Sequence, residues 1–297
     1  MDIRDMEIFL KIAEYENVSR AAAELHIAQP HLTHRLKLLE QDLGTELFTR
    51  EKKRLHITEE GRYLQQQCRQ MLQLKTKTEE QIRQMQDGYR GRIFIGAIET
   101  AGTIYLPRWI TGFRRKYPSV SYSLWTANSP DVVERMDRGL LDVALIRSIY
   151  DRDKFDGIHI RKEAWVVVLS SDHPLASKEG AITFRELAEE PLVVPTSRAE
   201  EVRSWFEAEG CRANIMCEFS PLMNAIVLAE RNLGVAILPD RSLAYFSDRS
   251  VIQKPLEKER FTDLYLIWKK DATISRAAQH FIDYVREDLG GDETGSV

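Results

Sequence analysis

The sequence has 297 residues, 43% of them hydrophobic and 30% charged, with a formal net charge of −4. This length predicts two or three globular domains. No apolar run is long enough to span a membrane, and the amphipathic N-terminus lacks the uninterrupted apolar core of an export signal. Three cysteines are too few for a disulfide framework, so we expect a protein of the reducing cytoplasm.

Bulk charge gives no sign of a nucleic-acid partner. Residues 1–90 contain 15 Lys and Arg and 15 Asp and Glu, so this segment is neutral. Any contact with a polyanion would require basic side chains gathered on one face.

The first 58 residues read as three short helices followed by a basic turn. Met6, Phe9, Leu10 and Ala13 form the apolar stripe of the first helix. Ser19 is the predicted N-cap of a second helix over residues 20–25. A third helix has Pro30 in its first turn, an apolar seam of Leu32, Leu36, Leu39 and Leu43, and its end at Gly44. The basic residues 50–54 follow at a predicted tight turn.

A long helix is predicted from Thr58 to about residue 87. Positions 64, 68, 71, 75, 78, 82 and 85 are spaced as a heptad seam, and Leu64, Met71, Ile82 and Met85 are its large apolar members. Two interpretations fit this pattern, a surface helix and a dimerisation helix.

From residue 91 strands and helices alternate, which predicts a parallel α/β sheet. Predicted strands cover residues 92–98, 120–126, 143–147, 164–170, 192–195, 216–219, 234–239 and 264–268. Predicted helices cover 105–116, 129–139 and 274–289, with Ser129 as the cap of the second. Others start near Thr183, where TFRE is a predicted capping box, and near Ser197 and Pro221. Two lobes of similar size result, one of about 91–161 with 266–290 and one of about 162–265, and we expect residues 290–297 to be disordered. Ligands of such sheets bind beyond the carboxyl ends of the strands.

Residues 6–61 resemble the DNA-binding domain of the LysR-type transcriptional regulators. The resemblance rests on Ser19-Arg20-Ala21-Ala22, Ala28-Gln29-Pro30, Leu43-Gly44, Leu47-Phe48 and Thr58-Glu59-Glu60-Gly61, in order and without insertion. It implies a winged helix-turn-helix over residues 1–58, a linker and dimerisation helix over 59–90, and an effector-binding domain over 91–297 with the two-lobed α/β fold of type 2 periplasmic binding proteins. It also implies a homodimer or homotetramer on double-stranded DNA, with RNA polymerase as a candidate partner.

Within this head, polar side chains lie off the leucine seam of the third helix, which suits the major groove. The predicted DNA-binding residues are Ser19, Arg20, Gln29, Pro30, His31, Thr33, His34, Arg35 and Lys37, with Arg50, Lys52, Lys53 and Arg54 on the wing. Gln29 is the predicted base reader and the wing residues the phosphate contacts. The alternative is an ordinary solvated polar face. His34 and a wing without glycine depart from the commoner family pattern, so the resemblance carries over DNA binding but not the base preference.

The resemblance also predicts where an effector binds in the body. The predicted effector-binding residues are Thr100, Gly102, Thr103, Asn128, Ser129, Arg147, Thr196, Ser197 and Arg198. Hydroxyls and backbone N–H groups at helix starts, with Arg147 at a strand end, favour a small anion, above all a carboxylate. The alternative for Arg147 is a salt bridge that holds the lobes together, with Glu99 as the partner considered.

Two rival functions have less support. The sequence contains no G-x-S-x-G, H-E-x-x-H, Walker or paired-cysteine motif, so we expect no catalytic residue, metal site or cofactor. A redox sensor of the same family would use Cys211 and Cys217, but Cys217 lies in the apolar segment IMCEF, where an inert packed thiol is the default. A transport binding protein would leave the helical head unexplained.

Overall fold

The structure is a computed structural model that describes residues 1–51, 54–84, 91–147, 149–220, 222–244, 250–270 and 274–292. The chain divides into two compact units, Met1–Arg83 and Gln84–Val297. Among the described residues, no helix is both long and apolar enough to cross a membrane.

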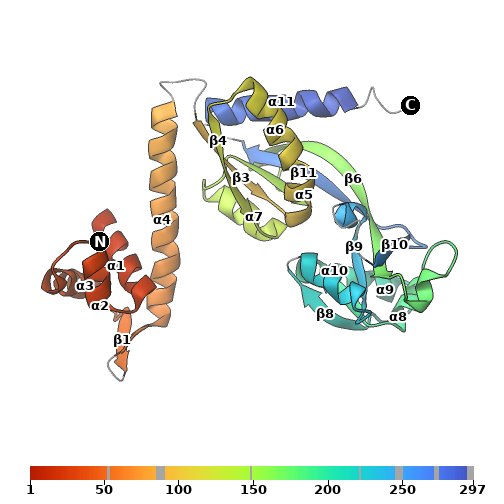
Figure 1. The fold of residues 1–297 in the computed structure, drawn as a ribbon, viewed down its shortest axis with the longest axis horizontal. Coiled ribbons are helices and arrows are strands. Elements are labelled where there is room, and N and C mark those ends of the chain that lie inside the picture. Colours follow the sequence, from red (N-terminus) through yellow and green to blue (C-terminus); the bar gives the residue numbers. More distant parts are fainter. Residues whose placement is uncertain are drawn as a thin grey trace. The chain divides into compact units, whose positions relative to one another are not determined.

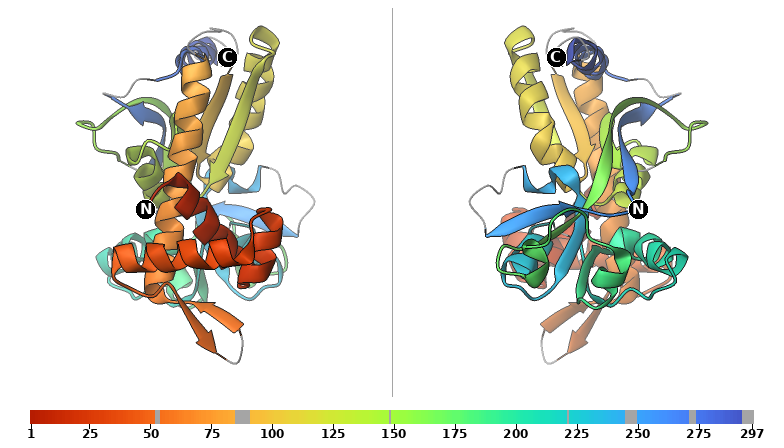
Figure 2. Two further views of the ribbon diagram at one scale, coloured as in Figure 1. Left: turned by 90° about the vertical axis from the view of Figure 1, so that its left-hand side faces the viewer. Right: turned by 90° about the vertical axis from the view of Figure 1, so that its right-hand side faces the viewer.

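The first unit is a helical head with a two-stranded wing and a long helix. Its elements are α1 (Ile3–Tyr15), α2 (Val18–Glu24), α3 (Gln29–Leu43), β1 (Phe48–Glu51), β2 (Arg54–Ile57) and α4 (Glu59–Gln84). An Asp2 capping box starts α1, Pro30 lies in the first turn of α3, and Gly44 ends α3 at φ 68°. The predicted cap Ser19 is wrong, because Asn17 caps α2 by accepting the Arg20 N–H. Figure 2 shows the three short helices packed together, with the β1–β2 hairpin projecting from them.

One hydrophobic core joins α1, α2 and α3 to the beginning of α4. Phe9, Ile12 and Leu32 are fully buried in it, and Leu64 and Cys68 of α4 close it from one side. At Gly61, α4 packs closely against the segment that follows α3, because an added Cβ would lie 2.3 Å from the Leu47 carbonyl oxygen. A residue without a side chain is therefore required there.

The second unit is an α/β body with two lobes (Figure 1). Lobe one contains β3 (Gly91–Ala97), α5 (Glu99–Ile104), α6 (Leu106–Lys116), β4 (Val120–Thr126), α7 (Ser129–Asp137), β5 (Val143–Arg147), β11 (Phe261–Lys269) and α11 (Arg276–Asp292). Lobe two contains α8 (Phe184–Ala188), β7 (Leu192–Pro195), α9 (Ala199–Ala208), β8 (Ile215–Phe219), α10 (Leu222–Glu230), β9 (Val235–Pro239) and β10 (Val251–Pro255), with the 3₁₀ turns η1 (Pro174–Ala176), η2 (Thr196–Arg198) and η3 (Asp240–Leu243). The strand β6 (Phe155–Ser170) belongs to both.

The described strands of the body form one sheet in the order β4-β3-β5-β11-β6-β9-β7-β8, with β10 paired to β6. The first half of β6 pairs with β11 and its second half with β9 and β10, so β6 crosses from lobe to lobe. The prediction of a parallel sheet is confirmed only in part, because β11 runs antiparallel to β5 and β6. The parallel triplets β4-β3-β5 and β9-β7-β8 remain, and they are the α/β halves that the alternation predicts.

Each lobe covers both faces of its half of the sheet. In lobe one, α6 and α11 bury Trp109, Phe113 and Phe281 on one face, while α7 covers the other. In lobe two, α8 and α9 cover one face and α10 the opposite one. The carboxyl ends of β3, β4 and β5 and of β7, β8 and β9 are left to the connecting loops, where this fold class binds ligands.

Several helices and strands begin or end at residues other than those predicted. β6 begins at residue 155 rather than 164; its first half, DGIHIRKE, was not predicted as a strand because five of its eight residues are charged or histidine and one is glycine. β10 and α5 were not predicted as elements. The α7 cap is Asn128 rather than Ser129, whereas the Thr183 capping box of α8 is confirmed. Pro221 and the tail 293–297 lie outside the described residues.

Candidate functional site

The exposed face of α3 gathers the polar residues predicted to contact DNA. Gln29, Pro30, His31, His34 and Lys37 are exposed and Thr33 is half-buried. They share this face because Leu32, Leu36 and Leu39 turn into the head core. The arrangement has the form of a recognition helix, apolar toward its own domain and hydrogen-bonding outward.

Gln29, the first residue of α3, is held by its neighbour α2. The Ser19 hydroxyl donates to Gln29 Oε1 at 3.1 Å. Arg20 lies beside them, with its guanidinium 4.9 Å from the centre of the Tyr15 ring. Both contacts restrict side chains that would otherwise be mobile, so the amide of Gln29 and the charge of Arg20 are presented together.

Arg35 differs from the other predicted residues. Its guanidinium bonds to Asp5 at 2.6 Å and to Asp2 at 3.0 Å. The hydrogen bond to Asp2 raises the pKa of Arg35. The pKa of Asp2 is lowered, most of all by the hydrogen bond from the Asp5 backbone N–H and next by the bond from Arg35. Arg35 therefore ties α3 to the start of α1, and we leave it out of the DNA-contact set.

The two strands of the wing pair antiparallel, with Phe48 opposite Ile57 and Glu51 opposite Arg54. Lys52, Lys53 and the side chains of Arg50 and Arg54 lie outside the described residues, so their predicted phosphate contacts stay predictions.

The heptad face of α4 divides into two parts. Leu64 is 8% exposed and packs in the head core, so its predicted place in a dimer seam is wrong. Further along the same face Met71, Leu74 and Ile82 are 37%, 44% and 57% exposed. Met85 lies outside the described residues. A helix that leaves such a row of large apolar side chains uncovered is typical of a helix with a partner.

A cavity of about 290 Å³ lies between the two lobes of the body, at the carboxyl ends of their parallel strands. Its polar lining residues are Glu99, Thr100, Thr126, Asn128, Ser129, Arg147, Ser197, Arg198 and Ser220, and its apolar ones are Ile98, Ala127, Trp165, Pro195, Phe219, Leu222, Leu238 and Pro239. This volume suits a small ligand with an apolar part and a few polar groups.

Arg147, the last residue of β5, is fixed on several sides. Its Nε and Nη2 donate to Glu163 Oε2 at 2.9 and 2.6 Å, and Nη2 also donates to Thr100 Oγ1 at 2.9 Å. The side chain of Glu163 is 1% exposed and that of Arg147 is 12% exposed. The alternative of a structural salt bridge is therefore present, but with Glu163 of β6 in place of Glu99.

Two further hydrogen bonds cross the cavity from lobe to lobe. Arg198 of η2 donates from Nη2 to the Arg147 carbonyl oxygen at 2.6 Å, while its Nη1 binds Glu201 at 2.8 Å. In the other direction, the backbone N–H of Leu222, at the start of α10, donates to Glu99 Oε2 at 2.6 Å. Each lobe thus holds a charged side chain of the other at the cavity wall.

A polar cluster continues along β6 beside the cavity. Arg161 bonds to Asp240 of η3 at 3.2 Å. Burial raises the pKa of Tyr105, and the negative charge of Glu163 raises it further. Among the described residues, Glu163 Oε1 and the indole N–H of Trp165 are buried without a hydrogen-bond partner. Buried polar atoms of this kind are expected to meet water or a ligand.

Six of the nine predicted effector-binding residues line the cavity: Thr100, Asn128, Ser129, Arg147, Ser197 and Arg198. Gly102, Thr103 and Thr196 do not. Residues 99–104 form the helix α5, in which Thr103 donates to the Glu99 carbonyl, and Thr196 instead donates to the Phe219 carbonyl.

Glu99, the first residue of the predicted pocket loop 99–103, lines the cavity although it was left out of the predicted effector-binding residues. The apolar wall of the cavity was not predicted. The signal available for that wall was the placement of Trp165, Phe219 and Leu238 close to predicted strand ends.

The cysteines are arranged unfavourably for redox sensing. Cys211 packs with the α8 and α9 side of the lobe-two sheet and Cys217 with the α10 side. Because the sheet separates them, a disulfide would require that lobe to rearrange. Cys68 is buried in the head core, which raises its pKa to about 11. Within the described part of the chain, no three His, Cys, Asp or Glu side chains gather as metal ligands.

Comparison with known proteins covers nearly the whole chain. A model of the bacterial regulatory helix-turn-helix of the lysR family matches residues 3–62, and a LysR substrate binding domain model matches residues 86–290. The HTH-type transcriptional regulator YvbU of Bacillus subtilis (strain 168) is 28% identical over 98% of this chain and 100% of its own. The HTH-type transcriptional activator CmpR of Synechocystis sp. (strain ATCC 27184 / PCC 6803 / Kazusa) is 27% identical over 99% and 97%. Among solved structures, full-length CbnR complexed with its target DNA has a TM-score of 0.78 at 21% identity, over 97% and 99%.

Proposed function

Because this chain belongs to the LysR family of DNA-binding transcriptional regulators, we propose that it reads its operator with the N-terminal end of α3 and is controlled by a small carboxylate in the interlobe cavity. As a DNA-binding regulator, it would work in the cytoplasm, as a homodimer or homotetramer joined through α4.

The geometry around Gln29 supports the DNA-reading part of this proposal. Gln29 is exposed at the first position of the recognition helix, and Ser19 fixes its amide from α2. A positioned glutamine amide can bond an adenine edge through both its donor and its acceptor. Arg20, His31, His34 and Lys37 surround it with donors for phosphates and bases.

Replacing Gln29 by alanine tests this role. We expect Gln29→Ala to weaken binding to a genomic target site by about 5- to 150-fold, because a bidentate base contact is worth about 1–3 kcal/mol. Binding to unrelated DNA should change little, since phosphate contacts supply it. Gln41→Ala is the matched control, because Gln41 is also exposed on α3 but lies about 18 Å further along the helix axis. Equal losses on target and unrelated DNA would contradict base reading by Gln29.

The donors at the cavity wall support a carboxylate effector. Among the described residues, Arg147 Nη1, Arg198 Nε and the Trp165 indole N–H have no hydrogen-bond acceptor. The hydroxyl of Ser197 and the beginning of α7 at Asn128 add neutral donors. N–H groups fixed in position around a partly buried cavity favour an anionic oxygen pair.

Thermal stability of the full chain tests this part, because a ligand of the folded state raises the melting temperature. We expect organic carboxylates to stabilise the protein and their neutral amides to have no effect. Stabilisation by neutral sugars or simple amines alone would contradict a carboxylate site.

A further inference from the structure

The charges around the cavity are unequally balanced. The pair Arg147–Glu163 and the pair Arg198–Glu201 each contain one positive and one negative side chain. Glu99 is the remaining charged residue of the lining, and no described cation pairs with it. A glutamate is ionised at neutral pH, so the cavity carries one uncompensated negative charge. A simple carboxylate would meet its donors and this repulsion together.

Glu99 is also placed to bind a ligand. It begins α5 in lobe one, and its Oε2 accepts the N–H of Leu222 from lobe two. Both residues line the cavity, so this bond holds the carboxylate at the cavity wall. The other oxygen, Oε1, has no partner among the described residues and remains an acceptor. A fixed carboxylate oxygen at the wall of a small cavity favours a charged hydrogen-bond donor.

We propose, on the basis of the function proposed above, that the effector is an α-amino acid or a closely related amino carboxylate with an apolar side chain. Its ammonium group binds Glu99, and its carboxylate binds the donors at Arg147, Ser197 and Arg198. Its side chain packs against Trp165, Phe219, Leu222 and Leu238. The volume of about 290 Å³ limits it to a small molecule. A zwitterion supplies one positive group for the unpaired glutamate and one negative group for the free donors.

Matched ligands separate the contribution of the ammonium group from that of the carboxylate. The full chain is melted in the presence of each common amino acid, of the same acid without its amine, and of the same amine without its carboxylate. For leucine these are 4-methylpentanoate and 3-methylbutylamine, and for phenylalanine 3-phenylpropionate and phenethylamine. Affinities for the best triplet are then measured by calorimetry. We expect one amino acid to bind at least about tenfold more tightly than either partner.

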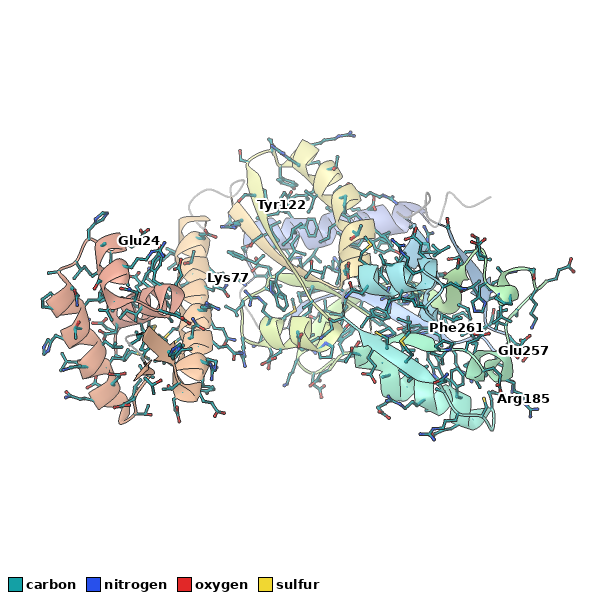
Figure 3. All side chains as sticks on the ribbon, turned by 60° about the horizontal axis from the view of Figure 1, so that its bottom comes forward. Glu24, Lys77, Tyr122, Arg185, Glu257 and Phe261 are labelled. Atoms are coloured by element: carbon teal, nitrogen blue, oxygen red, sulfur yellow. The ribbon has the colours of Figure 1, made fainter. Side chains whose placement is uncertain are left out.

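Glu99→Gln removes the charge but keeps an oxygen that can accept the Leu222 N–H, so the contact between the lobes is preserved. The variant should lose the preference for the amino acid over the matched acid. Glu257→Gln is the control, because Glu257 is exposed on lobe two (Figure 3) and is not one of the residues that line the cavity. It removes the same charge and should leave the preference unchanged.

The outcomes distinguish this inference from the proposed function. If a matched acid binds as tightly as its amino acid, or if Glu99→Gln retains the preference, the role of Glu99 is refuted while the carboxylate site stands. If amines bind as well as amino acids, or if no amino acid or acid of the panel stabilises the protein, both proposals are wrong.

Discussion

Removing Arg147 should destabilise the body far more than removing an ordinary surface arginine. Arg147→Met leaves the Glu163 carboxylate, 1% exposed, without the two bonds of 2.9 and 2.6 Å that it receives. Breaking a buried ion pair from one side costs about 3–5 kcal/mol. Glu163→Gln should cost less, about 1–3 kcal/mol, because Arg147 is 12% exposed and reaches the cavity. The double variant Arg147→Met/Glu163→Met should return to within about 1 kcal/mol of the natural protein.

Urea unfolding followed by tryptophan fluorescence measures these differences. All five tryptophans lie at or beyond residue 109, so the signal reports the body alone. Arg138→Met is the matched control, because Arg138 pairs with Glu134 on the surface, with the two side chains 39% and 58% exposed. It should cost less than about 1 kcal/mol. The reasoning fails if Arg147→Met costs no more than the control, or if the double variant is as unstable as Arg147→Met.

Three further predictions concern the head, α4 and α8. Gly61→Ala should destabilise the head by about 1–3 kcal/mol, because the new Cβ would lie 2.3 Å from the Leu47 carbonyl oxygen. Hydrogen exchange in α1–α3 measures this loss of stability. Gly290→Ala is the control and should have no such effect, because the space around Gly290 is open. Replacing Met71, Leu74 and Ile82 with glutamate should shift the protein toward monomers, as measured by light scattering. The same replacement at Arg62, Gln66 and Arg69, on the opposite face of α4, should leave the oligomer intact. If both sets of variants have the same oligomeric state, α4 is not the dimer interface. Glu186→Ala should cost about 1 kcal/mol at neutral pH through the lost capping box. Because bonds from Lys178 and Thr183 lower the pKa of Glu186 to about 2, this difference should persist above pH 4.5 and vanish as the pH falls through about 2; a difference unchanged at pH 2 would contradict the assignment.

The sequence was most informative where a local pattern decides the structure. Leu32, Leu36 and Leu39 of the predicted α3 seam, Pro30 at its start and Gly44 at its end follow from helix periodicity and capping, and all are confirmed; Leu43, the last predicted member of the seam, is 42% exposed instead. The Thr183 capping box was readable for the same reason. Local choices between neighbouring polar residues were less certain, since Asn17 and Asn128 cap the helices for which Ser19 and Ser129 were predicted.

The site depended on contacts between distant segments, which a single sequence does not encode locally. Arg147 was identified as important, but Glu163 lies in a strand half rich in charged residues that was not predicted as a strand. Glu99 was left out of the predicted effector-binding residues and named as a possible partner for Arg147, whereas its bond is with Leu222, 123 residues away. The apolar wall was missed because its members come from six separated segments that meet only when the sheet forms.

The central claim, that occupancy of the interlobe cavity controls DNA reading by the head, is tested most directly by DNA affinity. The affinity of the full chain for a target site selected from its own genome is measured with and without the compound that stabilises the protein most. We expect this compound to change either the affinity or the length of DNA protected from cleavage, and to have no effect on Ser197→Trp, in which the cavity is filled. DNA binding that is identical while the compound saturates the natural protein would contradict the claim.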